Sequence, residues 1–194
     1  LQHDTEMKFS DMQHEQGWYR LEVEAVYVND INVATEPAVL ASFADGKGTI
    51  VDSGTTDTYL PKTMQQAFHR AYKQQTNGRE FSNKKINLTY EDLMSLPTLY
   101  FHFEGAIVWT LAPESYMESL PVFGPSDFDE RGRLKPWTDT RVFIARLYLD
   151  EPRGAVMGAN AMLGHDILFD IENQRLGLAK SSCKATTTTA TAAA

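Results

Sequence analysis

The sequence lacks the features that mark several common classes of protein. No apolar run approaches the roughly 20 residues that cross a bilayer, and the first residues show no signal-peptide pattern. No phosphate-binding glycine loop is present, and the 5 histidines are scattered rather than set at metal-ligand spacing. The net charge of -8 argues against nucleic acid or an anionic membrane surface as a partner. We therefore expect no metal, no cofactor and no nucleic-acid partner.

Cysteine is almost absent, because Cys183 is the only one in the chain. A disulfide within the chain is excluded, so Cys183 is either a free thiol or bonded to a partner outside it. The chain also begins at Leu1 without an initiator methionine, and we expect it to be a processed or excised fragment.

What the sequence does contain is typical of a β-rich globular domain. Its 194 residues, 42% of them hydrophobic, suffice for one large domain or two small ones with a real core. Apolar residues alternate with glutamates from Leu21 to Ala25, as in a half-buried strand. Short strands outnumber helices and no strand–helix–strand rhythm is present. We therefore predict a mainly antiparallel β architecture with one or two short helices.

Local patterns place the main elements. A helix is predicted from Pro61 to the turn at Asn77 and Gly78, because its apolar residues recur at helical spacing. A capping-box spacing predicts a second, short helix that begins at Thr89. Further strands are predicted at residues 98–103, 107–111 and 141–149, a long surface loop at 119–140, and a polar connector at 1–17.

The most informative stretch is Thr49–Thr56, which reads Thr-Ile-Val-Asp-Ser-Gly-Thr-Thr. Its β-branched residues predict a buried strand that delivers the carboxylate of Asp52 at its exposed end. Such a carboxylate is costly unless neighbouring donors hold it. Three hydroxyl side chains and a glycine that permits close backbone approach follow directly: Ser53, Gly54, Thr55 and Thr56. We therefore predict that this turn is the functional site.

Two further blocks accompany this turn: Gly154–Gly158, which reads Gly-Ala-Val-Met-Gly, and the segment 167–183, which reads as a closing hairpin followed by cysteine. In order and spacing the three blocks resemble the C-terminal lobe of the pepsin-like aspartic proteases, and their residues are most similar to those of the β-secretase branch. The resemblance covers Trp18 to Lys184. It implies a pepsin-like acid protease lobe of antiparallel sheets in a barrel-like arrangement. In that family the final cysteine is disulfide-bonded within its own lobe, and this chain offers it no partner.

The resemblance implies a role for each residue of the turn. Asp52 is expected to be one of two catalytic aspartates, and Thr55 to donate to its outer oxygen. Ser53 is expected to make the interaction that joins the two catalytic loops across the lobes. Gly54 and Thr56 are expected to face the backbone of a bound peptide or protein substrate, and Ile50 to line a pocket on the primed side.

The second half of the catalytic pair is missing from the sequence. It holds no other D-[ST]-G-[ST] motif, so the expected partner is an N-terminal lobe that supplies the other aspartate, and this fragment alone should be inactive. Asp57 lies too near Asp52 in sequence to substitute, and we expect Asp166 and Asp170 to be turn or surface residues. A symmetric homodimer would restore a pair, but the helix and extra hairpins fit a two-lobed enzyme better.

Three domain segments are expected: the connector at 1–17, the protease lobe at 18–184, and a Thr/Ala-rich tail at 185–194 that cannot bury a core. The tail is either a stalk that leads to a membrane anchor beyond Ala194 or an inert terminus. Asn87 begins an N-glycosylation sequon. With the resemblance, it favours the secretory pathway, either outside the cell or in an acidic endomembrane compartment, with membrane tethering an option.

Two other functions stay open. Some pepsin-like relatives keep the fold without catalysis, so a binding or inhibitor module is the main alternative. A structural adhesion-type β domain with a Thr-rich stalk is the second, but it leaves the carboxylate at Asp52 unexplained.

Overall fold

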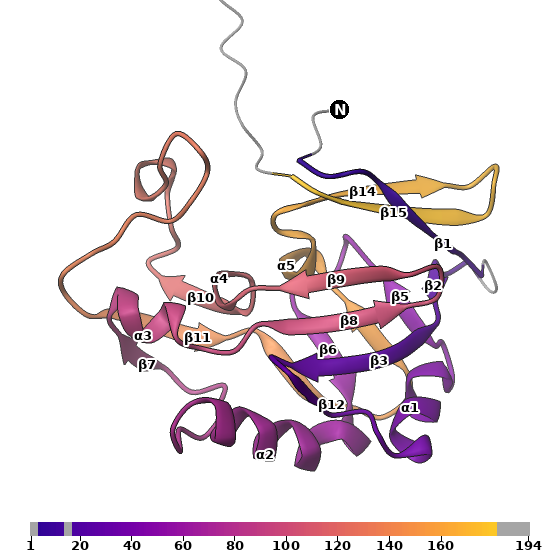
Figure 1. Cartoon of the computed structure of the whole chain (residues 1–194), viewed down its shortest axis with the longest axis horizontal. Helices are drawn as coiled ribbons and strands as arrows, with labels where there is room; N and C mark the ends of the chain where they lie inside the picture. Colours follow the sequence, from indigo (N-terminus) through magenta and orange to yellow (C-terminus); the bar gives the residue numbers. More distant parts are fainter. Residues whose placement is uncertain (1–3, 14–16, 182–194) are drawn as a thin grey trace, which may run out of the picture.

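The structure is a computed structural model that describes residues 4–13 and 17–181 (Figure 1). Cys183 and the Thr/Ala-rich tail lie outside the described residues. Within the described part of the chain, short strands assemble into four sheets, accompanied by short helices. The predicted mainly β, pepsin-like lobe is confirmed, with open sheets rather than a closed barrel among the described residues.

One four-stranded sheet is antiparallel throughout and has the order β4-β3-β8-β9. Its strands are β3 (Val23–Val28), β4 (Ile31–Asn32), β8 (Leu99–Phe103) and β9 (Ile107–Leu111). Two hairpins join strands of this sheet: Asn29 takes φ 51° in the turn between β3 and β4, and Gly105 takes φ 81° in the turn between β8 and β9. A side chain at Gly105 would lie 2.5 Å from the Phe9 carbonyl oxygen, so glycine allows the N-terminal strand to cross there.

The five-stranded sheet positions the predicted site. Its order is β12-β6-β13-β5-β2. The strands are β2 (Arg20–Leu21), β5 (Thr49–Val51), β6 (Thr58–Pro61), β12 (Leu147–Glu151) and β13 (Ala155–Met157). β13 lies between β5 and β6, parallel to the first and antiparallel to the second. The turn that joins β5 to β6 must therefore cross the carboxyl end of β13.

Two smaller sheets complete the lobe. One has the order β10-β11-β7 and the other β1-β15-β14. Their strands are β7 (Ile86–Leu88), β10 (Met117–Leu120), β11 (Arg141–Ala145), β1 (Lys8–Asp11), β14 (His165–Asp170) and β15 (Arg175–Lys180). In Figure 1 the second of these lies above the four-stranded sheet.

Two sequence predictions are corrected by these strands. Part of the predicted connector 1–17 is built into the lobe, because β1 pairs with β15 along its whole length. The single strand predicted at 141–149 is two strands, β11 and β12, which belong to different sheets. Arg146 separates them: its N–H donates to the Tyr116 carbonyl (2.8 Å), and its carbonyl accepts from the Thr58 N–H (3.2 Å).

The helices include both predicted ones. The first comprises η1 (Lys62–Met64) and α2 (Gln65–Gln75), and the second is α3 (Tyr90–Met94), which has a complete capping box. Four further helical segments were not predicted: α1 (Pro37–Ala44), η2 (Pro125–Asp127), α4 (Pro113–Tyr116) and α5 (Ala159–Met162). Three of these span about one turn, which is too short to show an apolar periodicity.

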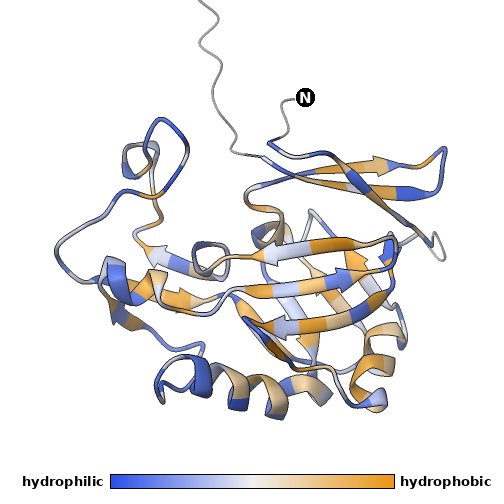
Figure 2. Cartoon of the chain, viewed as in Figure 1, coloured by the Kyte–Doolittle hydropathy of each residue, from blue (hydrophilic) through white to orange (hydrophobic). Residues whose placement is uncertain are grey.

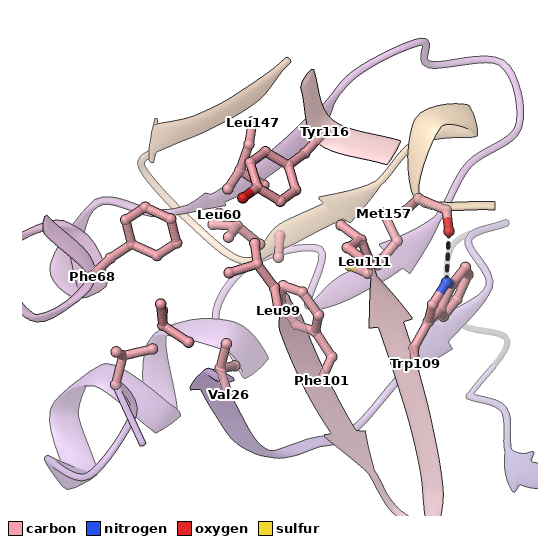
Figure 3. Close-up of a cluster of buried hydrophobic side chains, with 14 of the residues drawn as sticks. Val26, Leu60, Phe68, Leu99, Phe101, Trp109, Leu111, Tyr116, Leu147 and Met157 are labelled. Carbon is pink, nitrogen blue, oxygen red and sulfur yellow. Dashed lines mark hydrogen bonds between the residues drawn. The ribbon is translucent and has the colours of Figure 1, made fainter. Parts of the chain in front are cut away.

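The core joins these elements into one lobe. Figure 2 shows apolar residues concentrated on the strands, while the outward side of α2 is polar. Phe101, Trp109 and Tyr116 are fully buried in the cluster of Figure 3. The Trp109 indole Nε1–H donates to the Ala161 carbonyl at 2.7 Å, which ties β9 to α5. Fully burying each large apolar side chain contributes about 1.5–3 kcal/mol, so this cluster anchors α5 firmly.

Candidate active site

The turn between β5 and β6 presents Asp52 at the point where β5 ends. β5 itself is fully buried, whereas Asp52 is half-buried and the next two residues are exposed. On one side the Val51 N–H donates to the Tyr19 carbonyl (3.0 Å), and on the other the Asp52 N–H donates to the Met157 carbonyl (3.1 Å). The strand is held until the carboxylate emerges, so the acid lies at the lobe surface in a fixed position.

Two local donors hold the Asp52 carboxylate. The Gly54 N–H donates to Oδ1 at 2.9 Å, and the Thr55 hydroxyl donates to Oδ2 at 2.7 Å. The Thr55 hydroxyl, and after it the Gly54 amide, lower the pKa of Asp52, because both stabilise the ionised form. Burial acts in the opposite direction and is outweighed. Asp52 is therefore held as a carboxylate that water or a substrate can reach.

The other predicted site residues lie in different positions. Ser53 and Thr56 are exposed, on the open side of the turn. A Cβ atom added at Gly54 would have only the side-chain Oδ1 of Asp52 nearby, at 3.2 Å. Apart from its chain neighbours, no backbone atom of the described residues lies within 4 Å of that position. Ile50 is only 2% exposed and packs inside the sheet. This buried position argues against the substrate pocket that the resemblance implied for Ile50.

The close backbone approach expected at Gly54 occurs instead at Gly158. A Cβ atom there would lie 2.1 Å from the Asp57 carbonyl oxygen and 2.8 Å from the Thr55 carbonyl oxygen. The carbonyls of Thr55 and Thr56 also accept the N–H groups of Ala159 (2.7 Å) and Asn160 (3.0 Å). The first residues of α5 thus support the turn from beneath.

The side chain of Asn160 adds a link that the sequence did not suggest. Its Oδ1 accepts from the Thr58 hydroxyl (2.7 Å), and its Nδ2 donates to the Arg146 carbonyl (2.8 Å). Asn160 therefore joins the ends of β6 and β12. Its place two residues after the Gly-Ala-Val-Met-Gly block was the available signal, but an asparagine in a helix gives no indication of partners so distant in sequence.

No second carboxylate among the described residues hydrogen-bonds with Asp52, whose partners are the Gly54 amide and the Thr55 hydroxyl. Asp57 accepts no hydrogen bond from the described chain, and burial raises its pKa. The Asp170 carboxylate accepts hydrogen bonds from Arg175 (2.7 Å) and Asn173 in the β14–β15 hairpin. Asp166 lies on β14, where it pairs with Ala179 of β15. Asp52 thus has no carboxylate partner within the described part of the chain.

The described residues form neither a metal-binding cluster nor a membrane-spanning helix. No group of three or more histidine, cysteine or acidic side chains there could hold a metal ion. No helix within the ranges 4–13 and 17–181 is long and apolar enough to cross a membrane.

The sheet arrangement and the Asp52 turn together define the C-terminal lobe of a pepsin-like aspartic protease. The Xylanase inhibitor C-terminal family matches residues 18–121, over half of the chain, and the chain belongs to that family. It is 29% identical over 154 residues to the "Beta-secretase" of Strongylocentrotus purpuratus, and the matched region covers 70% of this chain and 26% of that protein. It is 26% identical over 171 residues to the "Aspartyl protease AED3" of Arabidopsis thaliana, and the matched region covers 85% of this chain and 34% of that protein. The chain thus spans about a quarter to a third of the length of these relatives.

Proposed function

We propose that this lobe is the C-terminal catalytic half of an aspartic endopeptidase that hydrolyses peptide bonds in proteins. The observation that carries the proposal is the Asp52 carboxylate, which emerges from a buried strand and is held by the Thr55 hydroxyl and the Gly54 amide. The two relatives named as a β-secretase and an aspartyl protease support it.

Hydrolysis by carboxylates needs two of them, about 3 Å apart, that share one proton. In the proposed mechanism a water molecule lies between Asp52 and an aspartate of the N-terminal lobe. One carboxylate removes a proton from the water, whose oxygen attacks the scissile carbonyl carbon, while the other, protonated acid donates to the carbonyl oxygen. Collapse of the tetrahedral intermediate then breaks the C–N bond as the leaving nitrogen takes a proton.

The hydrogen bonds at Asp52 suit the ionised member of such a pair. Donors that lower the pKa of Asp52 make its carboxylate a weaker base, but they keep it ionised at acidic pH. In the assembled site the two apparent pKa values belong to the pair, because the carboxylates titrate together. The second aspartate comes from an N-terminal lobe in this proposal, so the fragment alone is inactive.

The test replaces Asp52 with Asn in the full-length protein that contains this lobe. We expect the wild type to cleave a denatured protein at acidic pH and to be inhibited by pepstatin. We expect the variant to lose about a thousandfold in kcat, which lies within the usual contribution of one proton-transfer group. Asp139→Asn is the matched control, because this exposed loop residue has no described partner. Undiminished cleavage by Asp52→Asn would exclude the proposed role.

A second candidate function is a pepsin-like binding or inhibitor module without catalysis, and the description of the matching family favours it. An inactive relative keeps the fold and loses one aspartate, so the discriminating observation is whether the N-terminal lobe carries its own D-[ST]-G-[ST] motif. If that motif is missing and the protein inhibits a xylanase without cleaving protein, the inhibitor function replaces the enzyme.

We further propose that the protein enters the secretory pathway. Asn87 is exposed on β7, which is an edge strand of its sheet, so its side chain is accessible to modification. Tethering through an anchor beyond Ala194 remains part of this proposal, and membrane fractionation of the full-length protein tests it.

A further inference from the structure

A polar face lies beside the proposed catalytic turn, on β6 and β12. Along a strand successive side chains point to opposite faces. On β6 Thr58 and Leu60 are buried, whereas Tyr59 is half-buried, and on β12 Leu147 and Leu149 are buried, whereas Tyr148 is half-buried. The alternation places the residue before each strand, Asp57 and Arg146, on the same outward side as the tyrosines. We call Asp57, Tyr59, Arg146 and Tyr148 the outer face.

The two tyrosines of the outer face form a flat aromatic surface. β6 and β12 are parallel neighbours, and Tyr59 lies directly opposite Tyr148 in their register. The ring centroids are 5.1 Å apart and the ring planes differ by 17°, so the rings are stacked. A stacked pair of this kind offers a surface on which an aliphatic stem or a cationic group can lie.

The charges at the outer face are unequally satisfied. The Arg146 guanidinium donates twice to Glu118 Oε2, from Nε at 2.8 Å and from Nη2 at 2.5 Å, so its charge is already paired. The Asp57 carboxylate accepts no hydrogen bond and forms no salt bridge with any described residue, although it is half-buried. Burial raises the pKa of Asp57 by more than the nearby charge of Arg146 lowers it, so Arg146 compensates this carboxylate only in part. A half-buried carboxylate without a donor is unfavourable. An incoming cation would remove that cost.

The outer face begins at the end of the turn that carries Asp52. Asp57 is the second residue after Thr55, whose hydroxyl holds the Asp52 carboxylate. An extended peptide advances about 3.3 Å per residue. A substrate strand that places its scissile bond at Asp52 therefore brings a side chain near Asp57 within a few positions of the cleaved bond.

We propose that the outer face is a specificity subsite for a lysine or arginine side chain of the substrate. Asp57 is the ion-pair partner of the cation, and the Tyr59–Tyr148 stack receives its aliphatic stem. The inference rests on the proposed function, since it concerns peptide recognition at the same site. An acidic side chain is disfavoured, because the only cation of the face is committed to Glu118.

The test measures binding rather than cleavage. The full-length protein carrying Asp52→Asn is titrated with peptides that differ at one position, which holds lysine, norleucine or glutamate. The position is moved through the four residues on either side of the bond. We expect lysine to bind about tenfold more tightly than norleucine at one position, in the range of a charge-assisted hydrogen bond in a half-buried site. Equal binding of lysine and norleucine at all positions would overturn the proposal.

Variants at Asp57 assign the preference. Asp57→Asn should abolish the advantage of lysine and leave norleucine binding unchanged, and Asp57→Lys should transfer the advantage to glutamate. Asp139→Asn, on the long loop, is the charge-matched control and should keep the preference. A lysine preference that persists in Asp57→Asn would show that other groups bind the cation.

This readout separates the two proposals. Peptide binding by the Asp52→Asn variant does not depend on turnover, so a wild type that binds lysine peptides without cleaving them would contradict the protease and retain the subsite. A protein that cleaves peptides with no regard to charge would retain the protease and contradict the subsite. A protein that binds none of the peptides would overturn the subsite.

Discussion

Replacing Gly158 with alanine should damage catalysis more than stability. A Cβ atom at Gly158 would lie 2.1 Å from the carbonyl oxygen of Asp57, 2.7 Å from its carbonyl carbon and 2.8 Å from the carbonyl oxygen of Thr55. Gly158 has φ -82°, an ordinary value for alanine, so the substitution adds no backbone strain of its own. Its whole effect is the displacement of the turn that carries Asp52.

The magnitude follows from that overlap. Carbon and oxygen atoms rarely approach closer than about 3.3 Å, so the turn must move by about 1 Å. Inserting a methyl group into a packed site costs about 1–3 kcal/mol, which for a domain of this size lowers Tm by roughly 2–12 °C. A shift of about 1 Å at a catalytic group costs about a hundredfold in rate. We therefore expect kcat to fall about a hundredfold in protein that is still folded at assay temperature.

The assay compares kcat and Tm of the full-length protein with those of two variants. Gly124→Ala is the control, because Gly124 has φ -99° and the nearest atom to its added Cβ is 3.9 Å away. It should keep both values. If Gly158→Ala also kept the kcat and Tm of the wild type, the turn would not be held against the end of β13 as the structure shows.

Three further changes test separate contacts. Thr55→Val removes the largest cause of the lowered pKa of Asp52, so this pKa should rise in an NMR titration, and an unchanged pKa would contradict the hydrogen bond. A carboxyl group with a depressed pKa stabilises the fold at a pH above its unfolded pKa, and this stability is lost as the pH falls through its folded pKa. The variant should therefore also lose less stability on acidification. Trp109→Phe leaves the Ala161 carbonyl without its donor and should lower the free energy of unfolding by about 1–3 kcal/mol in urea; a smaller loss would mean that water replaces the indole. Asn87→Gln should remove a glycan and shift the mass of the secreted protein, whereas an identical mass would argue against modification there.

The hairpins and the Asp52 turn could be predicted because their signals are local. Alternation between polar and apolar residues identified β3, and the β5 turn carries its own donors within three residues. The helix from Pro61 showed apolar residues at helical spacing, and Thr89 showed a capping box that the structure contains. Each of these features is decided by neighbours in sequence, and periodicity reports neighbours.

Contacts between distant segments could not be predicted. Thr58 and Asn160 are 102 residues apart, and nothing near either one indicates the other. The insertion of β13 between β5 and β6 is likewise a property of the whole sheet. The loop predicted at 119–140 illustrates the same limit. Its Phe123 and Trp137 pack against Phe143, and the Arg141 guanidinium lies 4.8 Å from the Trp137 ring, so part of this surface loop is an aromatic cluster.

Three consecutive residues of α5 couple the core to the site. The Ala161 carbonyl accepts the indole N–H of Trp109 in the core, while the N–H groups of Ala159 and Asn160 donate to carbonyls of the turn that carries Asp52. A one-turn helix cannot move at one residue and stay fixed at the next, because its backbone hydrogen bonds close within that turn. A change in the core at Trp109 should therefore lower kcat as well as stability, although it touches neither Asp52 nor substrate. If Trp109→Phe lost stability but kept the kcat of the wild type at a temperature where it is folded, α5 would support the core and the turn independently.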